Sequence, residues 1–231
     1  DYVYPDSGAY YSYSTRGCIR KCSFCAVWRI EPEYQEYLPL RERIDRTRKL
    51  YGEQQNLLLM DNNVLASNRL EDIIEDIKSC GFTKGAKYFE PNWYTIAIRN
   101  LRLGINNRAY IRKSFKLLQE LNTFKSFNEN TRTEIYALRE KHRLLHLETC
   151  TREALIATYK DFAPYFDVKF KKRLGRLRFV DFNQGVDARL FNRHIVKLLA
   201  EIPVRPLRIA FDNIKTEPEY TKAIMMSEKY G

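Results

Sequence analysis

Short apolar runs alternate with helical patterns in the first part of the chain, and this alternation constrains the fold more than any other feature. Residues 10–16 are aromatic and typical of a strand. Residues 56–60 are almost continuously apolar, as in a strand covered on both faces. Apolar residues at helical spacing follow these runs, over residues 40–51 and 70–77. Strand and helix in alternation predict a parallel sheet with crossover helices.

The same alternation returns near the end of the chain. Residues 179–182 and 206–211 read as strands, and each is followed by polar turn residues. A helical pattern separates them, and another helix is expected after Pro218. We therefore expect parallel strands near residues 10–16, 57–61, 178–183 and 206–212, the last with an exposed edge.

Residues 86–177 interrupt the alternation with mostly helical patterns. Ile111, Phe115 and Leu118 lie at helical spacing, and Thr131 with Glu134 forms a capping box for a helix from about residue 132. We divide the chain into a core, residues 1–85 and 178–231, and a mainly helical insertion, residues 86–177.

The positive charge of the chain is local. Its formal net charge is +11, and residues 99–178 hold 19 Lys and Arg against 8 Asp and Glu, which leaves 21 of each elsewhere. The segment ends in a cluster of basic residues: Lys169, Lys171, Lys172, Arg173, Arg176 and Arg178. A local positive field attracts polyanions, so we expect the basic insertion to bind nucleic acid. The alternative is a solvated helical decoration.

Three of the five cysteines, Cys18, Cys22 and Cys25, lie within eight residues. This spacing fits a metal site in a reducing compartment better than a disulfide framework. Thiolates hold cubane iron–sulfur clusters, and close spacing lets one loop contact three irons. The alternative, a zinc knuckle, requires four ligands, and every histidine is distant in sequence. We interpret Cys80 and Cys150 as inert thiols.

The residues around these cysteines carry a family resemblance. Ser14-Thr-Arg-Gly-Cys18-Ile-Arg-Lys-Cys22-Ser-Phe-Cys25-Ala-Val resembles the CxxxCxxC signature of the radical SAM superfamily, including the aromatic Phe24 before the last cysteine. The longer form RGCxRxCxFC is most similar to methylthiotransferases and to cobalamin-associated members. The resemblance implies a partial (βα) barrel, here truncated, with Cys18, Cys22 and Cys25 as ligands of a [4Fe–4S] cluster.

The resemblance also implies a reaction and its partners. Radical SAM enzymes cleave S-adenosylmethionine reductively to methionine and a 5′-deoxyadenosyl radical, and they need an electron donor such as a flavodoxin or ferredoxin. We expect an enzyme that acts on RNA. The alternatives are a radical SAM enzyme for a peptide or small metabolite, with the insertion as a lid, and a non-catalytic iron–sulfur electron carrier. No catalytic residue is assigned.

Binding sites of βα barrels form at the carboxyl ends of the strands. We therefore predict that S-adenosylmethionine is bound there by polar residues and one aromatic: Phe24, Asp61, Asn62, Asn63, Gln184, Arg189, Asp212 and Asn213. Asn183 and Asp187 lie in the same turns. The Asp61–Asn63 turn departs from the GGE form of the superfamily, and residues 60–69 resemble the D-x-N-F type of cobalamin-associated members. The alternative is ordinary turn chemistry.

Composition and the chain ends complete these expectations. Charged residues make up 30% and hydrophobic residues 44%, which is typical of a globular protein. No apolar run approaches the roughly 18 residues of a membrane span, and no secretory leader opens the chain. We expect a cytoplasmic protein with no membrane partner. Since the chain lacks an initial Met and stops at Tyr230-Gly231, we also expect a fragment.

Overall fold

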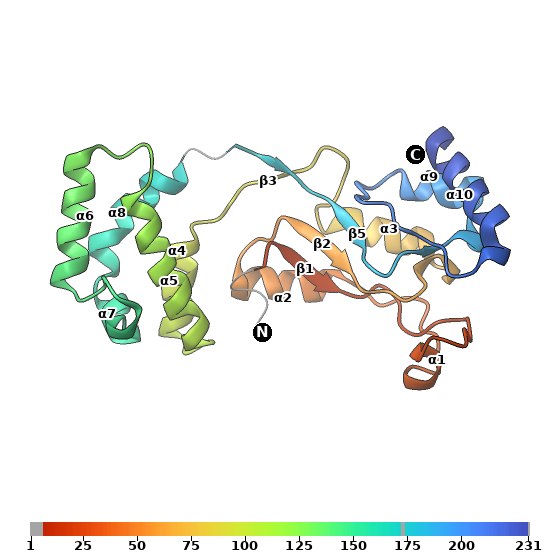
Figure 1. Ribbon diagram of the computed structural model, residues 1–231, viewed down its shortest axis with the longest axis horizontal. Helices are drawn as coiled ribbons and strands as arrows, with labels where there is room; N and C mark the ends of the chain where they lie inside the picture. Colours follow the sequence, from red (N-terminus) through yellow and green to blue (C-terminus); the bar gives the residue numbers. More distant parts are fainter. Residues whose placement is uncertain (1–6, 172–173, 231) are drawn as a thin grey trace. The chain divides into compact units, whose positions relative to one another are not determined.

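A computed structural model describes residues 7–171 and 174–230, and its chain forms two compact units (Figure 1). The sheet unit consists of Ala9–Thr47, Gln54–Tyr88 and Arg176–Gly231. The helical unit is built on Phe89–Gly175 together with Arg48–Glu53. The predicted limits of the insertion, residues 86 and 177, lie within three residues of these boundaries. The fold class is mixed α/β, as predicted, and the small sheets do not close into a barrel.

Three parallel strands form the main sheet of the sheet unit. The strands β1 (Ala9–Ser12), β2 (Asn56–Leu59) and β5 (Val180–Phe182) lie in the order β1-β2-β5. Leu57 pairs with Tyr10 on one side and with Val180 on the other, and all three side chains are buried. The first three predicted strands are therefore confirmed, and so is their parallel direction.

The fourth predicted strand joins a different sheet. β7 (Ile209–Ala210) pairs in parallel with β6 (Val186–Asp187). Gly185, between β5 and β6, has a φ of +79°, a conformation that glycine adopts without strain. This turn redirects the chain after β5, so that β6, and not β5, pairs with β7. An antiparallel pair, β3 (Lys87–Tyr88) and β4 (Arg176–Leu177), completes the strands of the described residues.

Helices of the sheet unit cover the sheets with their apolar sides. α3 (Leu70–Ser79) buries Ile73, Ile74 and Ile77 and stops at Gly81, whose φ is +92°. The other helical elements are α1 (Val27–Ile30), α2 (Arg41–Tyr51), η1 (Val64–Ala66), η3 (Ala188–Leu190), α9 (Arg193–Leu199), η4 (Ile214–Thr216) and α10 (Glu217–Tyr230). The end of α2, from Arg48, belongs to the helical unit. The core of the unit joins α2, η1, α3, η3, α9 and α10 to β1, β2 and β5, whereas α1 and η4 contribute no buried residue.

The helical unit has its own core, as the amphipathic patterns predicted. Its elements are α4 (Trp93–Arg102), α5 (Asn107–Asn122), α6 (Glu129–Lys141), η2 (Leu147–Thr149), α7 (Arg152–Ala157) and α8 (Tyr159–Lys171). The ring of Tyr94 stacks on Phe166 at a centroid distance of 4.1 Å. α6 is capped by Asn128, whose side chain accepts a hydrogen bond from the backbone N–H of Thr131. The capping residue is therefore Asn128, and the predicted capping box of Thr131 was wrong.

The predicted basic cluster does not form one solvated group. Arg178 is buried in the sheet unit, where it donates hydrogen bonds to the carbonyl oxygens of Gln54 and Gln55. Lys169 of α8 pairs with Glu120 of α5 at 2.6 Å. Lys172 and Arg173 lie outside the described residues. The charge of this segment thus divides between structural roles and the surface of the helical unit.

Candidate functional site

A cavity of about 480 Å³ lies in the sheet unit at the carboxyl ends of its parallel strands. It is lined by the three clustered cysteines and by every predicted cofactor residue except Asp61: Cys18, Cys22, Cys25, Phe24, Asn62, Asn63, Gln184, Arg189, Asp212 and Asn213. These residues come from the segments that follow β1, β2, β5, β6 and β7. Since parallel strands bring their carboxyl ends to one edge, segments distant in sequence meet there.

Asp61 does not line the cavity and instead anchors the segment that leads into the cysteine loop. Its side chain is 2% exposed. Its Oδ1 accepts hydrogen bonds from the backbone N–H of Ser14 (2.9 Å), from both hydroxyls of Ser14 and Thr15 (2.8 Å each) and from the backbone N–H of Thr15. In this structure Asp61 does not line the cavity, and its hydrogen bonds position the segment of Ser14 and Thr15.

The second carboxylate oxygen of Asp61 has no hydrogen-bond partner among the described residues. Burial raises the pKa of Asp61, although the hydrogen bonds from Thr15 and Ser14 act in the opposite direction. The carboxyl is thus a buried group that binds a proton more readily in the folded chain than in the unfolded one.

Gly17 turns the chain into the cysteine loop. Its φ is +75°, and a Cβ at this position would lie 2.5 Å from the carbonyl oxygen of Glu33. Its backbone N–H donates to Oε2 of Glu31 at 2.9 Å, and the guanidinium of Arg16 pairs with the same carboxylate. Arg16, and then the N–H of Gly17, hold the pKa of Glu31 below its usual value. Glycine before the first cysteine is therefore required by the backbone and by close packing.

The three cysteine side chains are half-buried, in a loop outside helix and strand. The sulfur of Cys18 accepts from the backbone N–H of Arg20 (3.4 Å) and from Nδ2 of Asn63 (3.7 Å). The sulfur of Cys25 accepts from the N–H of Val27 at 3.5 Å. Such donors also surround the sulfurs of protein-bound iron–sulfur clusters.

The cysteine donors fit a thiolate-bound cluster in chemical type and in their shared cavity. Their sulfurs are not gathered into a ligand set, however: within residues 7–171 and 174–230, no group of three or more His, Cys, Asp or Glu side chains is arranged to hold a metal ion. Since the loop is irregular and only half-buried, cluster binding would require the sulfurs to draw together.

Asp187 forms the most strongly charged contact of the cavity. Its side chain is 8% exposed and accepts from Nε of Arg189 (2.6 Å), from Nε of Arg20 (3.0 Å) and from Nδ2 of Asn63 (3.4 Å). Burial alone would raise the pKa of Asp187, but the hydrogen bonds from Arg189 and Arg20 outweigh it and lower the pKa. This carboxylate, on the last residue of β6, therefore links the cysteine loop, through Arg20, to the segment that follows β6, through Arg189.

Arg20 was missing from the predicted site, although its place between Cys18 and Cys22 could have indicated it. Asn63 was predicted, and the structure shows how it is held: the hydroxyl of Tyr34 donates to its backbone carbonyl oxygen at 2.9 Å. Asn63 therefore contacts both the Cys18 sulfur and the Asp187 carboxylate from a backbone position fixed by hydrogen bonding.

None of the helices in the described part of the chain has the length and apolar character needed to cross a bilayer. Comparisons with protein-family models, curated proteins and solved structures return no match for this chain.

Proposed function

We propose that the chain is a radical SAM enzyme that binds a [4Fe–4S] cluster through Cys18, Cys22 and Cys25. The observation that carries the proposal is that these cysteines and polar groups from several strand ends line one cavity. When bound, the reduced cluster supplies the electron that cleaves S-adenosylmethionine to methionine and a 5′-deoxyadenosyl radical.

The residues of the cavity match the groups that S-adenosylmethionine carries. Arg20 and Arg189 share the single carboxylate of Asp187, so the three side chains together keep a positive charge for the carboxylate of the cofactor. Asp212 supplies acceptors for its amino group and ribose hydroxyls. Phe24 is 70% exposed at the cavity, so its ring is available to pack on the adenine. The side-chain amide of Asn63 also lines the cavity and can hydrogen-bond the cofactor.

We expect anaerobically reconstituted, dithionite-reduced protein to release 5′-deoxyadenosine from S-adenosylmethionine. Asn63→Ala should weaken S-adenosylmethionine binding about tenfold, because it removes a hydrogen bond to a charged ligand. The exposed Asn68, which lies outside the cavity, provides the matched control in Asn68→Ala. Chromatography measures the product, and equilibrium binding measures the affinity.

Two results would contradict this function. Protein that binds the cluster but leaves S-adenosylmethionine intact would be an iron–sulfur electron carrier. Equal affinity in the Asn63 and Asn68 variants would place the cofactor elsewhere.

We propose RNA as the substrate, because the positive charge gathers in the helical unit. Phe89–Gly175 contains 17 Lys and Arg against 9 Asp and Glu. A small cavity of about 220 Å³ on this unit is lined by Lys113, Lys116 and Lys169 beside the ring of Trp93, together with Glu90 and with Glu120, the ion-pair partner of Lys169. Tyr94, Tyr110 and Phe127 are buried in the core, so these aromatics are not available for stacking on bases.

Binding of RNA to the chain should weaken steeply as salt rises, because lysine contacts to phosphates release counterions. Lys116→Gln with Lys171→Gln, both exposed on the helical unit, should make the slope of log K against log salt shallower by about 1.4, or about 0.7 for each phosphate contact with a single strand. Lys84→Gln with Lys87→Gln, exposed on the sheet unit, serves as the control of equal charge. Absence of binding at low salt, or identical slopes for both variants, would leave the helical unit as a lid or a decoration.

A further inference from the structure

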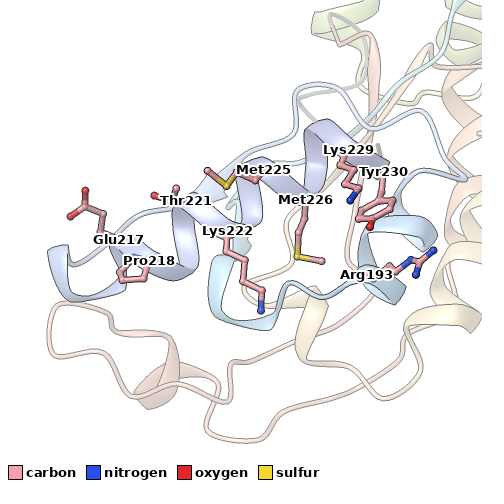
Figure 2. A pocket seen from close by; sticks show the side chains of 9 residues that line it. All are labelled: Arg193, Glu217, Pro218, Thr221, Lys222, Met225, Met226, Lys229 and Tyr230. Carbon is pink, nitrogen blue, oxygen red and sulfur yellow. The ribbon is translucent and has the colours of Figure 1, made fainter.

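A second cavity of the sheet unit, about 610 Å³, is a shallow groove along α10 (Figure 2). Three cations line it, Arg193 from α9 and Lys222 and Lys229 from α10. Between the cations lie the apolar side chains of Met225 and Met226. We call these residues, with the aromatic Tyr230, the α10 groove.

The charge of the α10 groove is ordered by helical spacing. Lys222, Met226 and Lys229 lie at positions i, i+4 and i+7, which share one face of a helix. Lys222 and Met226 extend from the same side of α10 in Figure 2. The acidic residues Glu219 and Glu228 do not line the groove, and Glu217 at its start is its only acid. This face is therefore net positive.

The cations of the groove remain available to a partner. Within the described part of the chain, none of Arg193, Lys222 and Lys229 forms an ion pair with a carboxylate. Arg193 and Lys229 instead each lie 5.3 Å from the ring centre of Tyr230. Met225 is 63% exposed. An apolar centre with a cationic rim is complementary to an acidic protein surface that has apolar side chains at its middle.

The α10 groove begins where the cysteine cavity ends. Thr216, the last residue of η4, lines the cysteine cavity, and the next residue, Glu217, lines the groove. α10 also packs against η3, which contains the cavity residue Arg189. A protein seated in the groove therefore lies beside the cysteine loop's cavity.

We propose that the α10 groove docks a small acidic electron-donor protein. The inference rests on the proposed function. Each S-adenosylmethionine that is cleaved consumes one electron, which the donor protein supplies and is thereby oxidised. The exposed Met225, beside the half-buried Met226, favours a protein over a nucleic acid, because a thioether side chain adapts to apolar partners and would gain nothing from a phosphate backbone.

The test uses the full chain and a reduced, acidic flavodoxin as the probe. We expect calorimetric titration to show binding that weakens as salt rises, because the attraction is between exposed charges. Lys222→Glu with Lys229→Glu should weaken binding at least about tenfold, since both substitutions place like charges against the donor. The control is Lys84→Glu with Lys87→Glu, two exposed lysines of the same unit outside the groove, which should bind like wild type.

Several outcomes overturn the docking proposal. The first is no binding of flavodoxin at low salt, and the second is equal affinity of the groove variant and the wild type for flavodoxin. The third is a wild-type chain that self-associates while the groove variant stays monomeric, which would assign the groove to a second copy of the chain. Dithionite reduces without docking, so the groove variant should still release 5′-deoxyadenosine with it. If wild type releases none with dithionite, the proposed function fails, while the titration still decides the docking.

Discussion

Replacing Cys18, Cys22 or Cys25 with alanine is expected to remove the iron from anaerobically reconstituted protein. The unsubstituted chain should hold about four irons and four sulfides, as one cubane cluster requires. Each substitution removes one of three thiolates that share a cavity, and no further cysteine lines it to take its place. Iron and sulfide analysis measures the loss, and circular dichroism shows whether the chain remains folded.

Cys80→Ala and Cys150→Ala are the matched controls, and both should retain the full iron content. Both thiols are buried. Burial raises the pKa of Cys80, and it raises the pKa of Cys150 to about 11, so both stay protonated near neutral pH. Since metals bind the thiolate, neither is suited to hold iron. Loss of iron from a control, with retention in the loop variants, would show that the cluster is assigned to the wrong cysteines.

Asp61→Ala should lower the free energy of unfolding by about 3 kcal/mol, because it leaves the donors of Ser14 and Thr15 without an acceptor in a buried position. Asp61→Asn should cost clearly less, since the amide oxygen can replace Oδ1 and the amide nitrogen falls where Oδ2 has no partner. Urea denaturation measures both. Equal losses in the two variants would show that the hydrogen bonds to Oδ1 do not anchor this segment.

Comparing wild type with Asp61→Asn also predicts how the free energy of unfolding depends on pH. Because burial raises the pKa of Asp61 in the folded chain, the stability linked to its proton is fully present below the unfolded value, about 3.9, and is lost as pH rises through the folded pKa. Asp61→Asn has no such proton. Relative to wild type, the Asn variant should therefore be more stable at pH 7 than at pH 4. The opposite trend would mean that the hydrogen bonds, and not burial, dominate the titration.

Much of the sheet and of the cavity could be predicted from the sequence. Residues 56–60 and 179–182 are mostly apolar over a length that suits a covered strand, and they form β2 and β5 of the β1-β2-β5 sheet. The cavity followed from the rule that parallel strands carry their binding residues at one end, which brings Asn63, Gln184 and Asp212 together. The chemistry of the cysteine motif is a prediction from the same sequence.

Only the tertiary structure decided how these segments meet. Asp61 and Asn63 follow the same strand, yet Asp61 binds Ser14 and Thr15 while Asn63 lines the cavity, a difference that residue type does not encode. Arg20 and Asp187 are 167 positions apart and join in one ion pair. The α10 groove likewise depends on Arg193 of another helix. Local patterns report which face of an element is apolar, whereas contacts between distant polar side chains depend on how the packed elements place them.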